Sequence, residues 1–132
     1  MLLVEDSPTD VFVIKEVLDA CAVDLRVLVA KDGHEALQVL RGLPAEDCPA
    51  LILLDLNIPK VNGLEVLRQV RAGSNCQETP VVIVSSSRAD EDRGTAERLG
   101  ANAYFQKPAD LQSYTQLGMI VERMLGHTGA GS

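Results

Sequence analysis

A chain of 132 residues suits one domain, and 46% hydrophobic with 23% charged residues is typical of a folded protein rather than a disordered one. The net charge is −7 and no cluster of Lys or Arg forms a basic stripe, which disfavours direct nucleic-acid binding. No apolar run approaches the roughly twenty residues of a membrane helix, and the first residues lack the basic flank of a secretory signal. The sequence therefore predicts a cytoplasmic protein without membrane association.

The cysteines are odd in number and lack metal-ligand spacing. They stand at Cys21, Cys48 and Cys76. We interpret them as reduced thiols, some of them filling the core.

Short apolar runs alternate with longer amphipathic ones. Residues 2–4 predict a first strand, and Ser7 then caps a helix that has Pro8 at its first position. Apolar residues at steps of three and four give this helix one buried face: Val11, Ile14, Leu18 and Cys21. A second strand over 25–30 leads through a turn at 32–33 into a short helix, which Pro44 stops. The inward positions of that helix are Ala36, Leu37 and Leu40.

The second half of the chain repeats this alternation. Residues 51–54 are apolar without alternation, which is typical of a strand covered on both faces, and they end at Asp55. After a loop over 56–62 comes a helix, with Leu64, Leu67 and Val70 in its turns. A β-branched fourth strand over 81–84 ends in serines, and a polar helix over 89–99 stops at Gly100. A fifth strand over 103–105 precedes Lys107-Pro108 and a last helix over 110–125.

Five strands that alternate with five helices predict an α/β protein with a doubly wound, five-stranded parallel sheet. We expect the domain at 1–125 and a flexible, Gly/Ser-containing tail at 126–132. In such sheets ligands bind outside the carboxyl ends of the strands, where the strand order reverses. The residues at those ends are Glu5, Asp6, Asp55, Ser85 and Lys107.

These strand-end residues meet the requirements of phosphoryl transfer. If the first and third strands are neighbours, three carboxylates share one pocket and need a cation, and oxygen ligands with open positions suit Mg²⁺. An aspartate beside such an ion, here Asp55, is a candidate nucleophile. Lys107 supplies an ammonium and Ser85 a hydroxyl for the charge on the transferring group.

Each residue also has a simpler explanation. Glu5-Asp6 could be a polar loop, Asp55 a turn residue, and Lys107 a solvated lysine. Ser85 could cap the next helix, in competition with Ser86 and Ser87. Because all of them fall at one edge of the sheet, the functional interpretation is favoured.

The motifs together resemble the receiver domain of response regulators, over Leu2 to about Leu125. They are Val4-Glu5-Asp6, Leu53-Leu54-Asp55 with the following Pro59 and Gly63, Val84-Ser85, and Lys107-Pro108. The separations 85 − 55 = 30 and 107 − 85 = 22 are usual for that family. The resemblance implies a (βα)5 flavodoxin-like fold with strand order 2-1-3-4-5.

The resemblance implies that Asp55 is the phosphoacceptor, which takes its phosphoryl group from a histidine kinase or phosphotransfer protein. Glu5, Asp6, Asp55 and the backbone carbonyl of Asn57 would hold Mg²⁺. Ser85 would bind a phosphoryl oxygen and Lys107 would pair with it. The protein would be a switch that promotes its own phosphorylation and dephosphorylation, rather than an enzyme with a separate substrate.

The resemblance implies further roles around this site. Lys107-Pro108 would be a cis peptide, since X–Pro is where cis bonds occur. Tyr104 would be the aromatic switch residue; the simpler alternative is a half-buried strand aromatic. Asn57 and Ser87 fall where the family tunes the lifetime of its phosphorylated state.

The resemblance also implies partners for the protein, and other functions are alternatives to it. Residues 55–59 and 107–111 look most like stand-alone receivers paired with phytochrome-type kinases, with a homodimer through the fourth helix, fifth strand and fifth helix. The main alternative is a receiver fragment of a regulator with a DNA-binding or enzymatic output domain. A haloacid dehalogenase-type hydrolase needs an acid where Asn57 stands, and a flavodoxin needs a phosphate loop where residues 5–8 stand. A pseudo-receiver would lack some of the key residues. His34 and His127 are expected at the surface.

Overall fold

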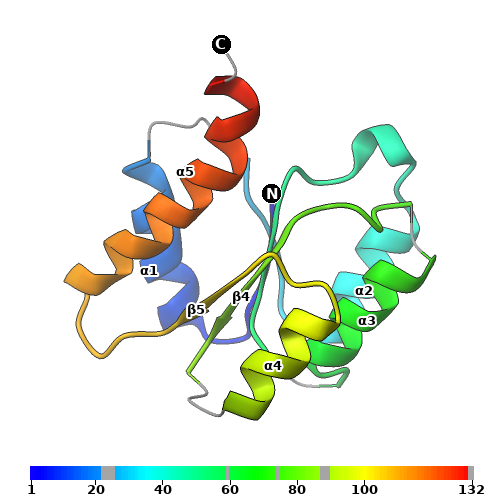
Figure 1. The fold of residues 1–132 in the computed structure, drawn as a ribbon, viewed down its shortest axis with the longest axis horizontal. Helices are drawn as coiled ribbons and strands as arrows, with labels where there is room; N and C mark the ends of the chain where they lie inside the picture. The colour runs from blue at the N-terminus through cyan, green and yellow to red at the C-terminus, as the bar shows by residue number, and fades with distance from the viewer. Residues whose placement is uncertain (22–25, 59, 74, 87–89, 131–132) are drawn as a thin grey trace.

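A five-stranded sheet with helices on both faces makes up the computed structural model, which describes residues 1–21, 26–58, 60–73, 75–86 and 90–130 (Figure 1). The strands are β1 (Leu2–Val4), β2 (Leu28–Ala30), β3 (Ile52–Leu54), β4 (Val81–Ser85) and β5 (Ala103–Gln106). The helices are α1 (Pro8–Asp19), α2 (Gly33–Arg41), α3 (Gly63–Gly73), α4 (Asp90–Arg98) and α5 (Thr115–Ala130). Short 3-10 turns, η1 (Ala45–Asp47) and η2 (Gln112–Tyr114), precede β3 and α5.

All strand pairs are parallel, in the order β2-β1-β3-β4-β5, which confirms the predicted fold. The chain winds outward from β1 to one side and from β3 to the other, so the order reverses between these two strands. Their register pairs Val4 with Leu54. The next residue on each strand is an acid, Glu5 and Asp55, so the register alone brings these two carboxylates to one point of the sheet edge.

The core consists of one apolar layer on each side of the sheet. Successive strand residues point to opposite faces, so Leu2 and Val4 join the layer under α2, α3 and α4, while Leu3 joins the layer under α1 and α5. Figure 1 shows α1 and α5 together on one side of the sheet and the other three helices on the opposite side. β1, β3 and β4 are buried along their whole length, which explains their apolar sequences without alternation.

The helix starts follow the expected capping chemistry. The Ser7 hydroxyl accepts a hydrogen bond from the Asp10 backbone N–H at 3.3 Å, with Pro8 in the first turn of α1. The predicted turn at 32–33 is the start of α2, where the Asp32 carboxylate accepts from the Glu35 N–H at 2.7 Å. Both caps satisfy N–H groups that have no partner within the helix.

Some element boundaries differ from the sequence prediction. β2 begins at Leu28 rather than at 25, and residue 25 itself lies outside the described part of the chain. The last helix begins at Thr115 after the 3-10 turn η2, and it continues to Ala130 instead of ending at 125. A domain boundary at 125 remains a prediction.

The interpretation of the cysteines as reduced thiols was wrong for two of them. Cys48 and Cys76 form a disulfide with their Cα atoms 5.5 Å apart, and Cys21 is a free thiol. The pair joins the segment before β3 to the segment before β4. The two cysteines are close because β3 and β4 are adjacent parallel strands that start at the same edge of the sheet. Their separation of 28 residues in the sequence gave no sign of this.

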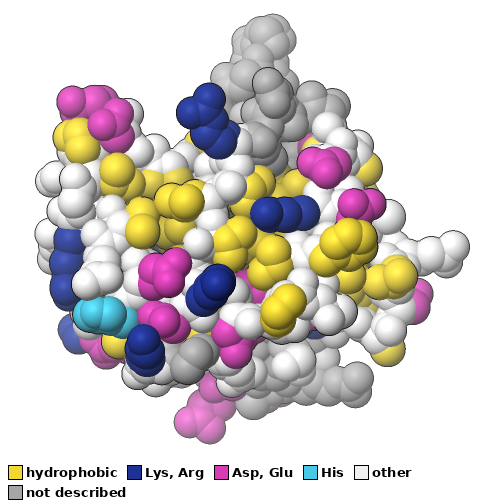
Figure 2. Space-filling model, turned by 180° about the vertical axis from the view of Figure 1, so that it is seen from behind, with side chains coloured by type: hydrophobic (Ala, Val, Ile, Leu, Met, Phe, Trp, Pro, Cys, Tyr) yellow, Lys and Arg dark blue, Asp and Glu magenta, His cyan; other side chains and the backbone are white. Residues whose placement is uncertain are grey.

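The surface carries mixed charge. On the face shown in Figure 2, Lys and Arg side chains are scattered among acidic and apolar ones instead of forming a continuous stripe. Among the described residues, no helix has the length and apolar content to cross a membrane.

Candidate functional site

Acidic residues from two strand ends form a cluster at the switch point of the sheet. Glu5, after β1, and Asp55, after β3, are buried, whereas the neighbouring Asp6 is exposed. One carboxylate oxygen from each of the three lies within 4.8 Å of the others. The sequence predicted this convergence, and its oxygen-only donor set is the type that binds hard divalent cations.

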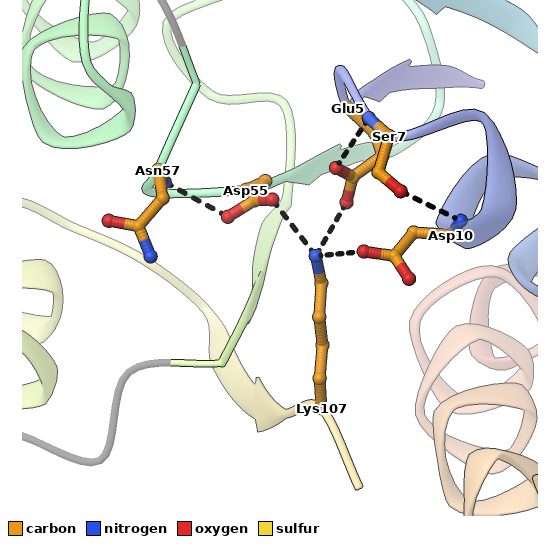
Figure 3. Close-up of polar contacts among 6 residues, drawn as sticks. All are labelled: Glu5, Ser7, Asp10, Asp55, Asn57 and Lys107. Atoms are coloured by element: carbon orange, nitrogen blue, oxygen red, sulfur yellow. Dashed lines mark hydrogen bonds and ion pairs between the residues drawn. The ribbon is translucent and has the colours of Figure 1, made fainter. Parts of the chain in front are cut away.

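Lys107 reaches into this cluster from the end of β5. Its Nζ donates to Glu5 Oε1 at 2.8 Å, to Asp10 Oδ2 at 2.7 Å and to Asp55 Oδ2 at 2.9 Å (Figure 3). An ammonium has three N–H donors, so each has a carboxylate partner. The lysine side chain is only 11% exposed, which makes these contacts stronger than surface ion pairs.

The backbone brings Lys107 to this position without a cis peptide. Its N–H donates to the Ser85 carbonyl at 2.8 Å, which continues the β4–β5 ladder one residue past the strand. The described residues contain no cis bond, so the predicted cis Lys107-Pro108 peptide was wrong. The trans form is the ordinary preference before proline, and the ladder hydrogen bond already directs the side chain into the pocket.

Asp55 is fixed by its backbone and by the start of α3. Its N–H donates to the Val4 carbonyl at 3.0 Å, and its Oδ1 accepts from the Asn57 N–H at 2.9 Å. Gly63, the first residue of α3, packs so closely that an added Cβ would lie 2.4 Å from the Asp55 carbonyl oxygen. Glycine at 63 therefore lets α3 begin directly against the loop that carries Asp55.

Burial and charge act in opposite directions on the two groups of the main ion pair. Burial raises the pKa of Glu5 to about 7, because desolvation and the nearby Asp55 charge outweigh the hydrogen bond from Lys107. For Lys107, burial lowers the pKa, but hydrogen bonds to Asp10, Glu5 and Asp55 more than offset this, so its pKa is raised. Lys107 is thus the permanent cation of the site, and the raised pKa of Glu5 makes its carboxylate costly to ionise.

Ser85 and Tyr104 lie on β4 and β5, the two strands that follow β3 in the sheet. Ser85 ends β4 fully buried, opposite Gln106 of β5. Tyr104 is half-buried on β5, and the Arg93 guanidinium of α4 lies 4.8 Å from its ring centre. This cation–π contact ties the ring to α4. Of the two predicted lifetime positions, Asn57 is exposed beside Asp55, and Ser87 lies outside the described residues.

The sequence analysis missed Asp10, which makes the shortest of the Lys107 contacts. Its place three residues after the Ser7 cap marks it only as an acid in the first turn of α1. The available signal was its position in the first turn of the helix that directly follows Glu5-Asp6, which places it at the same end of the fold as the acid pair. Tyr114 of η2 was missed as well. Its buried phenol packs against Phe105 and has a raised pKa, caused first by burial and then by the Asp10 charge.

Comparison with known proteins agrees with this geometry. The response regulator receiver domain family matches residues 1–117. The chain belongs to this family, and it is therefore a phosphoacceptor module of two-component signalling, a switch rather than a conventional enzyme. Receiver domains of this family interact with sensor histidine kinases or phosphotransfer proteins.

Similar proteins include regulators named for phytochromes. Response regulator Rcp1 of Synechocystis is 32% identical, over 92% of this chain and 85% of Rcp1. The phosphorylated cyanobacterial phytochrome response regulator RcpA superposes with a TM-score of 0.85 at 35% identity, over 96% of this chain and 93% of RcpA. Mn²⁺-bound Rcp1 superposes with a TM-score of 0.82 at 33% identity, over 92% and 90% of the two chains.

A more distant receiver carries magnesium. The receiver domain of sensor histidine kinase PA1611 from Pseudomonas aeruginosa has Mg²⁺ in its active-site cleft and superposes with a TM-score of 0.76 at 28% identity, over 95% of both chains. Metal-bound receivers are thus among the structural relatives of this chain, whose own acidic cluster has the ligand types that a divalent cation requires.

Proposed function

We propose that Asp55 is the phosphoacceptor of this receiver. The observation that carries the proposal is the Lys107 ammonium, 2.9 Å from Asp55 Oδ2 and bonded to Glu5 in the same buried pocket. A carboxylate that receives a phosphoryl group gains negative charge at that point. A fixed cation within hydrogen-bond distance offsets this charge without reorganisation.

In the transfer, a carboxylate oxygen of Asp55 forms a bond to phosphorus while the bond from phosphorus to its donor breaks. With a phosphohistidine donor, the bonding pair returns to the imidazole nitrogen, which takes up a proton. The product is an acyl phosphate on Asp55. Lys107 stays beside Asp55 before the reaction and pairs with the new negative charge after it.

The acidic cluster fits Mg²⁺ as the ion of this site. Glu5, Asp6 and Asp55 supply hard oxygen donors, and the backbone carbonyl of Asn57 is the further ligand that the family resemblance implies. When bound, the ion neutralises charge on the phosphoryl oxygens. Among the described residues, Lys107 is the one cation paired with Glu5 and Asp55, so a carboxylate excess remains for a divalent ion to balance.

The conformational signal would pass through Ser85 and Tyr104. The Ser85 hydroxyl would bind a phosphoryl oxygen, and the Tyr104 ring would move inward as β4 shifts. That motion would break the contact with Arg93 and alter the surface formed by α4, β5 and α5. Asn57 and Ser87 would set the lifetime of the phosphorylated state.

The test is the intact mass of the protein after incubation with acetyl phosphate and Mg²⁺. The native chain should gain one phosphoryl group, and Asp55→Asn should gain none. Asp110→Asn changes an exposed acid outside the cluster and is the matched control, which should react like the native chain. An adduct on Asp55→Asn, or none on folded native protein, would refute the assignment.

The kinase partner and the homodimer belong to the same proposal. Similarity to the phytochrome response regulator RcpA favours a phytochrome-type histidine kinase as the donor. The homodimer would use α4, β5 and α5, where Met119 of α5 is 62% exposed. Sedimentation of the native chain and Met119→Lys, with and without acetyl phosphate, tests this, since only the native chain should dimerise. A cytoplasmic location remains a prediction.

A further inference from the structure

Asp10 occupies a special place around Lys107. Its Oδ2 lies 2.7 Å from Lys107 Nζ, closer than the partner oxygens of Glu5 and Asp55. Asp10 comes from α1 and is not among the three acids whose oxygens could surround a cation. Figure 3 shows it on the side of Lys107 away from Asp55 and Asn57. Lys107 therefore has two partners inside the acidic cluster and one outside it.

Each carboxylate oxygen of the two partners inside the cluster already accepts one hydrogen bond. Glu5 Oε2 accepts from the Ser7 N–H and Oε1 from Lys107, while Asp55 Oδ1 accepts from the Asn57 N–H and Oδ2 from Lys107. The backbone donors are fixed by the chain, but the lysine side chain can rotate away. A divalent cation that uses these carboxylates competes with Lys107 for their oxygens and repels its ammonium.

We propose that Asp10 is a positioning residue that retains the Lys107 ammonium when Glu5 and Asp55 turn to the bound cation. This inference rests on the proposed function. Once the cation has taken Glu5 and Asp55, an ammonium without Asp10 would have no carboxylate partner. It would stay buried beside a second positive charge, which is costly. With Asp10, Lys107 remains charge-paired and at the mouth of the site, where a phosphoryl group on Asp55 would need it.

The local structure keeps Asp10 suited to this role. It lies in the first turn of α1, where the positive end of the helix dipole favours an ionised carboxylate. The Ser7 cap fixes its backbone N–H. Its side chain is 29% exposed, whereas that of Glu5 is 1% exposed, so Asp10 lies at the outer side of the lysine.

The experiment is a double-mutant cycle on Mg²⁺ affinity, measured by titration calorimetry. Asp10→Ala should weaken Mg²⁺ binding by about tenfold in the native background, the scale of one hydrogen bond to a charged group. In the Lys107→Met background the same change should weaken binding by less than about twofold, because Asp10 acts through the lysine. Asp19→Ala removes an exposed acid at the other end of α1 and should leave the affinity unchanged.

Three results would overturn the proposal: no effect of Asp10→Ala, an equal effect in both backgrounds, or an equal effect of Asp19→Ala. Absence of Mg²⁺ binding to the native chain would instead refute the proposed function and this inference together. A crystal structure of the Mg²⁺-loaded native chain is an independent measurement that needs no destabilised variant. In that structure Lys107 Nζ should stay hydrogen-bonded to Asp10 and should have left Glu5 or Asp55. A lysine that still bonds to both Glu5 and Asp55 would contradict the proposal.

Discussion

Lys107→Met removes the one cation that, within the described part of the chain, pairs with Glu5 and Asp55. The two carboxylate side chains are 1% and 6% exposed, so water cannot replace the ammonium in the folded state. Breaking a buried ion pair from one side costs about 3–5 kcal/mol of unfolding free energy. Glu5 can offset part of this cost by binding a proton, so we expect a loss of about 3 kcal/mol at pH 8.

The loss should depend on pH in a defined direction. At pH 5 Glu5, whose pKa is raised to about 7, is already protonated in the native fold. Removing the lysine then no longer leaves a buried charge at Glu5, so the loss should fall to roughly half. A variant that loses as much stability at pH 5 as at pH 8 would show that packing of the lysine stem, not charge, is responsible.

Urea unfolding followed by circular dichroism, in EDTA, measures both values. With a slope of about 1–3 kcal/mol per M, a loss of 3 kcal/mol lowers the midpoint by roughly 1–3 M. Lys15→Met, which removes an exposed lysine from α1, is the control and should leave the midpoint within about 0.5 kcal/mol of the native value. A Lys107→Met midpoint equal to that of the control at pH 8 would refute the electrostatic account of the site.

Three further changes test other parts of the structure. The native fold binds the Glu5 proton more tightly than the unfolded chain does, so the unfolding free energy in EDTA should fall by up to about 3 kcal/mol as pH rises from about 4.5 to about 7. Glu5→Gln should flatten this pH dependence in urea titrations. Gly63→Ala places a Cβ 2.4 Å from the Asp55 carbonyl oxygen and should cost about 1–3 kcal/mol of stability and slow phosphorylation by acetyl phosphate; native behaviour in both assays would contradict the close packing. Cys48→Ser removes the bridge to Cys76 and should lower the unfolding free energy by about 3–4 kcal/mol in oxidising buffer and not at all in reducing buffer. Equal stability of the native chain and the variant in oxidising buffer would argue against the disulfide.

The sequence was sufficient to predict the parts of the site that depend on strand order. Apolar runs that end in Glu5, Asp55 and Ser85 place those residues at one edge of any parallel sheet, so the convergence needed no knowledge of side-chain packing. The fold followed for the same reason, since strands alternating with helices leave few other arrangements.

The missed features depend on contacts between segments that are distant in the chain. Asp10 meets Lys107 across 97 residues, because the end of β5 lies beside the first turn of α1. The Cys48–Cys76 bridge likewise depends on two strands starting side by side. The predicted cis bond at Lys107-Pro108 was wrong. It was inferred from the family resemblance alone, whereas the β4–β5 ladder already directs the Lys107 side chain inward with a trans bond.

The central claim is that Asp55 itself receives the phosphoryl group. Borohydride converts an aspartyl phosphate to homoserine, so treatment of the acetyl phosphate-reacted protein, followed by peptide mass spectrometry, locates the modified residue. We expect Mg²⁺-dependent conversion at Asp55 alone. Conversion at Glu5, Asp6 or Asp10 instead, or at no residue of a folded and Mg²⁺-loaded protein, would contradict it.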